Sequence, residues 1–187
     1  MLADYLPFVT ATQLADYSKG KISGTDPRVN DALIGASTAI RRYCGWHIFP
    51  AVQGESITLD GPGGRELALP SVHVTAVQSI TQCDVLLDES AYSWSELGEV
   101  HLKRGCWSDE YRSITAVIDH GYDDVPDIQR VVLAMVSREL SSPSGATREQ
   151  AGQVSVSYAL TSAGVSGGVS VLQSEYAVLD TYRIVGA

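Results

Sequence analysis

Residues 114–136 read ITAVIDHGYDDVPDIQRVVLAMV and contain both of the patterns that decide the fold. Ile114, Ala116 and Ile118 recur at every second position, which is typical of a half-buried β-strand. A turn follows, and Pro126 suits the first turn of a helix because it has no amide hydrogen to leave unpaired. The apolar residues that come next at helical spacing are Ile128, Val131, Val132, Met135, Val136 and Leu140. The stretch therefore predicts a strand that leads into a helix.

The N-terminal region predicts a short helix. Thr10 and Gln13 have the spacing of a capping box, in which each side chain bonds the backbone amide of the other residue. Leu14 and Tyr17 are expected to face inward from this helix, and Gly20 is expected to end the element.

A longer helix is predicted to follow. Asp26 suits the N-cap and Pro27 suits the first helical position. Apolar residues then recur at helical spacing, namely Val29, Ala32, Leu33, Ala36, Ile40 and Tyr43. Gly45, directly after Cys44, suits the left-handed position that closes a helix.

The part of the chain between this helix and the strand at Ile114 changes to a period of two, which predicts antiparallel strands. Residues 57–59 and 67–69 alternate on the two sides of residues 60–64, a glycine-rich turn, and are expected to form a hairpin. Further along, residues 92–102 predict a second hairpin around a turn at residues 96–99.

The order of these patterns predicts an α+β fold. Residues 1–50 and 122–145 are expected to form a small helical core, and residues 51–121 an antiparallel β unit inserted into it. Residues 146–187 are expected to form an extended C-terminal assembly arm that ends in a short helix.

The expected arm has three parts. Alternating residues from Val154 to Leu160 predict a strand, and residues 162–168 are a linker rich in Gly and Ser. The terminal helix carries an apolar stripe of Leu172, Tyr176, Leu179 and Tyr182. So short a helix needs a docking surface, and we expect a neighbouring subunit or a partner protein to supply it.

The composition bounds the function. Charged residues make up 19% of the 187 residues, against about 25% in ordinary soluble domains, which favours a surface partly buried against partners. The net charge is −9 and no basic stripe is present, so tight sequence-specific binding of nucleic acid is not expected. The composition does not exclude loose contact with DNA that passes through an acidic channel.

The cysteines and the hydropathy indicate the compartment. Cys44, Cys83 and Cys106 form no C-x-x-C pair, which predicts free thiols in a reducing compartment and not a disulfide framework. The N-terminus has no signal-peptide pattern, and residues 151–174, although uncharged, are too rich in Ser and Gly for a membrane span. We expect a soluble protein that does not contact a membrane.

One acidic stretch suggests chemistry. Residues 119–127 hold His120 and four carboxylates, and such sets bind metals or move protons. The carboxylates are Asp119, Asp123, Asp124 and Asp127. The interpretation we favour is structural, because aspartates stabilise the start of a helix.

Cys44 and His47 form a Cys-x-x-His pair, which is half of a zinc site. The other candidate ligands are scattered over the β unit; they are His73, Cys83, His101 and Cys106. A site assembled only in three dimensions is the alternative. With no nucleophile, phosphate-binding or zinc-protease motif in the sequence, we predict no catalytic residue, no cofactor and no metal ligand.

Two segments resemble the head-to-tail connector (adaptor) proteins of long-tailed bacteriophages. Residues 31–46, DALIGASTAIRRYCGW, are similar to the helix that opens those proteins, although Cys44 stands where a polar residue is usual. Residues 118–126 and the apolar positions after them resemble the segment that leads into their next long helix. The resemblance covers most of residues 8–160, and is closest to versions from phages of actinobacteria.

This resemblance implies a structural virion protein and not an enzyme. Such proteins assemble in the cytoplasm of the host bacterium and then lie in the neck of the virion, as a twelve-subunit ring beneath the portal. The ring lines the channel that DNA traverses and offers a surface to the next neck protein, while the C-terminal segment reaches toward the portal. The alternatives are another neck or tail subunit, such as a tail terminator or stopper, and a small α+β enzyme or ligand-binding protein.

Overall fold

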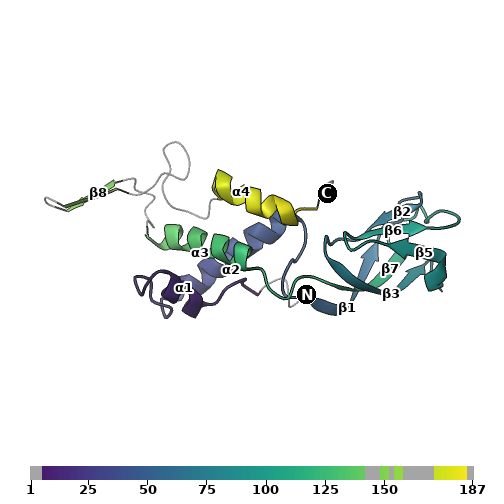
Figure 1. Ribbon diagram of the computed structural model, residues 1–187, viewed down its shortest axis with the longest axis horizontal. Helices are drawn as coiled ribbons and strands as arrows, with labels where there is room; N and C mark the ends of the chain where they lie inside the picture. The colour runs from purple at the N-terminus through teal and green to yellow at the C-terminus, as the bar shows by residue number, and fades with distance from the viewer. Residues whose placement is uncertain (1–5, 142–147, 152–153, 158–170, 185–187) are drawn as a thin grey trace. The chain divides into compact units, whose positions relative to one another are not determined.

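The protein has a mixed α+β fold, as predicted. The computed structural model describes residues 6–141, 148–151, 154–157 and 171–184 (Figure 1). The chain divides into a helical unit, Met1–Cys44 with Val125–Thr181, and a β unit, Gly45–Asp124 with Tyr182–Ala187. Within the described residues, no helix combines the length and the apolar character that crossing a membrane requires.

The helical unit packs four helices together (Figure 1). They are α1 (Ala11–Tyr17), α2 (Pro27–Cys44), α3 (Pro126–Ser141) and α4 (Gln173–Leu179). The capping box of Thr10 and Gln13 is present at the start of α1. The carboxylate of Asp26 accepts the amide of Arg28 at 2.9 Å, which satisfies a donor that the first turn of α2 leaves unpaired.

The core of this unit comes from the faces that the helical spacing predicted. Val29, Leu33 and Ile40 of α2 are buried. The buried residues of α3 are Ile128, Val131, Val132, Met135 and Val136, and Val125 directly before the helix is buried as well. Tyr17 differs from the prediction, since 46% of it is exposed while Leu14 is fully buried. In so short a helix the single buried position at Leu14 suffices to dock it.

The β unit contains two antiparallel sheets (Figure 1). The first has the order β1 (Val52–Leu59), β7 (Ile114–His120), β3 (Val74–Gln82), β4 (Val85–Leu86). The second has the order β2 (Glu66–Ala68), β6 (Glu99–Leu102), β5 (Tyr92–Trp94). A 3-10 turn, Glu89–Ala91, precedes β5. Alternate residues of β7 are buried, as its period of two predicted.

The hairpin predicted around residues 60–64 is wrong. Strand β1 pairs with β7, and β2 pairs with β6 in the other sheet. The glycine-rich turn docks on the chain instead of closing a hairpin, because the amide of Gly61 bonds the carbonyl of Glu110 and that of Gly63 bonds the carbonyl of Ser108, both at 2.9 Å. A Cβ at Gly61 would lie 2.1 Å from the Ser108 carbonyl oxygen. The second predicted hairpin is confirmed, as β5 and β6.

The described parts of the C-terminal region form a further hairpin and α4. Strands β8 (Arg148–Ala151) and β9 (Val154–Ser157) pair antiparallel. Tyr158, Leu160 and the predicted linker at residues 162–168 lie outside the described residues. A 3-10 turn, Asp180–Tyr182, follows α4 directly.

Candidate functional site

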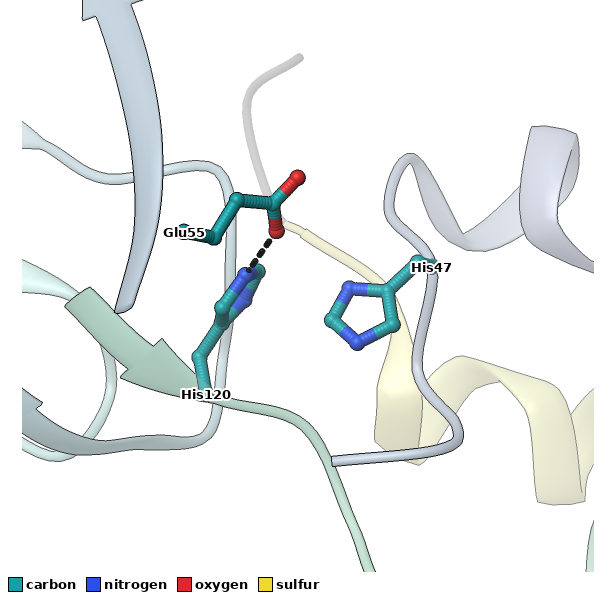
Figure 2. Close-up of side chains that lie close together, drawn as sticks. All are labelled: His47, Glu55 and His120. Carbon is teal, nitrogen blue, oxygen red and sulfur yellow. Dashed lines mark hydrogen bonds and ion pairs between the residues drawn. The ribbon is translucent and has the colours of Figure 1, made fainter. Parts of the chain in front are cut away.

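The β unit brings together three side chains that carry metal-ligating atoms: His47, Glu55 and His120 (Figure 2). His47 lies in the segment that precedes β1, Glu55 lies in β1, and His120 is the last residue of β7. One ligand atom of each residue lies within 4.8 Å of the others. We call these residues the imidazole–carboxylate cluster.

A β-bulge aims Glu55 at His120. Strand β1 pairs with β7 in register from Glu55 to Leu59, but the register shifts between Val52 and Glu55. Gly54 lies in this shift with a φ of 63°, a conformation that glycine adopts without a steric cost. Its amide donates to the Asp119 carboxylate at 2.7 Å, which holds the bulge against β7.

Hydrogen bonds orient the side chains of the cluster. Nε2 of His120 lies 2.6 Å from Oε2 of Glu55. Nε2 of His47 lies 2.9 Å from the carbonyl oxygen of Pro50; because a carbonyl only accepts, this nitrogen carries the donated hydrogen. The centroids of the two imidazole rings are 4.4 Å apart at an interplanar angle of 78°. His120 is 3% exposed, whereas 38% of the Glu55 side chain is exposed.

Aromatic rings and a glycine enclose the cluster. Trp46 stacks over His120 with ring centroids 6.4 Å apart. Gly121 has a φ of 97°, and a Cβ there would lie 2.7 Å from Nε2 of His47. This glycine therefore allows the chain that leaves β7 to pass directly against the imidazole of His47. Nearby, His73 and Tyr122 stack with centroids 4.1 Å apart.

The acidic stretch does not converge on one point. Asp119 accepts bonds from the Gly54 amide and, at 2.6 Å, from Nε2 of Gln78. Asp127 accepts the Ile128 amide at 2.9 Å in the first turn of α3. Asp123 and Asp124 are exposed. Of this stretch, only His120 belongs to the imidazole–carboxylate cluster.

The other candidate ligands are also separated. Cys44 is buried in the helical unit, where its thiol lies 3.6 Å from the carbonyl of Leu179, whereas His47 belongs to the β unit. Cys83 and Cys106 are exposed. His101 pairs with Glu66 at 2.5 Å, between β6 and β2. The sequence analysis did not identify Glu55 as a candidate ligand, because no local pattern indicates which strand pairs with β1.

Helix α4 docks on the helical unit of its own chain. Nη1 and Nη2 of Arg138 on α3 bond the two carboxylate oxygens of Glu175 at 2.7 and 2.8 Å. Leu179 is fully buried, and the phenol of Tyr43 on α2 bonds Asp180 at 2.5 Å. This differs from the expectation that a neighbour must cover the terminal helix. Residues of α2 and α3 supply the docking surface, and the bidentate ion pair holds the short helix in register.

The comparisons with known proteins come from a family model and from solved structures. The model of the family described as "Head completion protein" matches residues 7–137, which is well over half of the chain. The chain belongs to the head completion protein family. This agrees with the resemblance to phage connector proteins. No curated protein matches the sequence of this head completion protein.

Two solved structures have a similar fold. One is a chain from the neck of a native GTA particle computed with C12 symmetry, with a TM-score of 0.53 and 12% identity, over 95% of this chain and 91% of that one. The other is a chain from the neck of an empty GTA particle computed with C6 symmetry, with a TM-score of 0.56 and 12% identity, over 99% of this chain and 94% of that one. The fold of this head completion protein is thus similar to that of a neck subunit over nearly its full length.

Proposed function

We propose that this protein is a head-to-tail connector (adaptor) in the virion neck of a long-tailed phage. The observation that carries the proposal is the family match over residues 7–137. A fold shared with GTA neck chains over at least 95% of this chain supports it. In this role the protein assembles in the cytoplasm of the host bacterium, then binds the portal on one side and the next neck or tail protein on the other.

The proposed assembly is a closed ring of twelve subunits. The GTA necks were computed with C12 and C6 symmetry, and a closed ring suits a protein that must surround a channel. The low share of charged residues, 19%, favours extensive burial between subunits. Residues 146–187 contribute to this assembly as an arm, with the exception of α4, which stays docked on its own subunit.

The proposed ring lets DNA pass without gripping it. Each subunit carries a net charge of −9, and an acidic wall repels phosphate, whereas clustered Lys and Arg would release counterions and bind DNA tightly. This role needs no catalytic residue and no cofactor.

A structural subunit of another kind is the nearest alternative. A tail terminator would be expected to have one larger continuous sheet and no helix after Asp124. The chain instead has two small sheets in the β unit and begins α3 at Pro126. These features favour the connector over the terminator.

Size measurement of the purified chain, alone and with the portal protein, tests the proposal. A ring of twelve subunits of 20.0 kDa has a mass twelve times that value, about 240 kDa. We expect this species, or a portal complex with twelve-fold symmetry, in mass photometry and negative-stain images. A chain that stays monomeric and does not bind portal at any ratio would refute the connector role.

A further inference from the structure

We propose that His47, Glu55 and His120 bind a divalent transition-metal ion of the Zn²⁺ type that holds the β unit together. This goes beyond the proposed connector role, and it differs from the prediction, made from the sequence, that the chain has no metal ligand. The proposal stands on the geometry of the imidazole–carboxylate cluster, on its burial and on one buried polar atom.

The donor set suits a transition metal. Two imidazoles and one carboxylate are a set that Zn²⁺ accepts, with a fourth position left for water or another ligand. The three ligand atoms already lie within 4.8 Å of one another, so small side-chain rotations bring them to bonding distance. Glu55, with 38% of its side chain exposed, leaves a route by which a hydrated ion reaches the two buried histidines.

The surroundings of the histidines resemble the outer shell of a metal site. Nε2 of His47 donates to the Pro50 carbonyl at 2.9 Å. A bond of this kind fixes the tautomer and the ring orientation of a metal-binding histidine. Gly121 and Trp46 hold the two rings in place on their other sides.

A buried nitrogen of His120 supports the metal site independently of the cluster geometry. Its Nδ1 is buried, and among the described residues it has no hydrogen-bond partner. A buried polar nitrogen without a partner is uncommon, and an ion or an ordered water is a usual explanation. His120 is only 3% exposed, and its other ring nitrogen, Nε2, is the atom that faces Glu55 at 2.6 Å and would bind the ion.

A metal at this place would join both ends of the β unit. His47 precedes the first strand of the unit, and His120 ends the strand after which the chain returns to the helices. Glu55 connects them through β1. Because the ion binds the folded state, it stabilises that state by mass action, and because its ligands must be deprotonated, it binds more weakly as the pH falls.

Metal titration of the full-length chain, free of any affinity tag and treated with chelator, tests the site. Zn²⁺ is followed by calorimetry and by thermal unfolding, and Co²⁺ by its visible absorption. We expect one saturable site per subunit and a higher unfolding temperature with Zn²⁺. Glu55→Gln should weaken binding at least about tenfold, since even partners in the outer shell of a metal site contribute that much.

Glu66→Gln is the matched control. It makes the same chemical change in the other histidine–carboxylate pair of the β unit, His101 with Glu66. This variant should bind Zn²⁺ and Co²⁺ like the unaltered chain. Both variants change an exposed or half-exposed side chain, and circular dichroism without metal verifies their folding. Absence of saturable binding, or equal binding by the Glu55→Gln and Glu66→Gln variants, would overturn the proposal.

Discussion

Replacing Leu179 with alanine should loosen α4 from the helical unit even in an isolated subunit. Leu179 is fully buried on its own chain, so the substitution removes packed methyl groups and leaves a cavity. Leucine-to-alanine changes in cores cost about 2–5 kcal/mol. A helix of only seven residues relaxes more easily than a long one, so we expect about 2–4 kcal/mol.

Hydrogen exchange measures this cost directly. Each 1.4 kcal/mol is a factor of about ten in an equilibrium constant, so the opening of α4 should become roughly 30-fold to 1,000-fold more frequent. Exchange followed by mass spectrometry on the peptide that covers α4 reports that ratio when the open helix recloses faster than its amides exchange. The same peptide in the unaltered, monomeric chain should be protected.

Leu97→Ala is the control for this experiment. It makes the same change at a residue that is 68% exposed, and it should leave exchange in α4 unchanged. If α4 exchanges as fast in the unaltered monomer as in the Leu179→Ala variant, the helix does not dock on its own subunit. The original expectation, a helix covered only by a neighbour, would then replace the docking described above.

Two further substitutions and one binding measurement have expected outcomes. Gly121→Ala should destabilise the β unit by about 2 kcal/mol or more, because φ is 97° and the new Cβ would approach His47; Gly64→Ala, where no atom lies within 4 Å, is the control in urea unfolding. Hydrogen bonds from Arg28 lower the pKa of Asp26 from 3.8 to about 2. Its contribution to stability is therefore present above pH 4 and is lost as the pH falls toward 2, so the difference between the unfolding midpoints of Asp26→Asn and the unaltered chain should shrink over that range. The proposed ring of twelve subunits would carry a formal charge of twelve times −9, or −108. We therefore expect it to bind duplex DNA weakly, and submicromolar, salt-sensitive binding would contradict the proposed free passage.

The local elements of this fold were predictable because local chemistry specifies them. Asp26 and Pro27 mark the start of α2, and Gly45, with a φ of 87°, follows its last residue. The period of two in β7 and the helical period in α3 come from which residues must be buried, and each acts within one element. The hairpin of β5 and β6 also depends on neighbouring residues alone.

The pairing of distant segments was decided only in the tertiary structure. Residues 57–59 alternate equally well against β2 or β7, and the choice depends on where the glycine-rich turn docks, namely on residues 108–110. The imidazole–carboxylate cluster follows from that choice, since Glu55 reaches His120 only if β1 pairs with β7 across a bulge.

The sequence by itself determined the positions of the four described helices, the acidic charge and, through two short segments, the family. It did not determine that α4 packs on its own subunit, because the apolar stripe of a short helix fits any apolar surface. The packing of α4 on its own subunit is specified by the bidentate hydrogen bonds between Arg138 and Glu175, which are 37 residues apart in the chain. Contacts at such a separation have no local signature, so the three-dimensional arrangement alone specifies them.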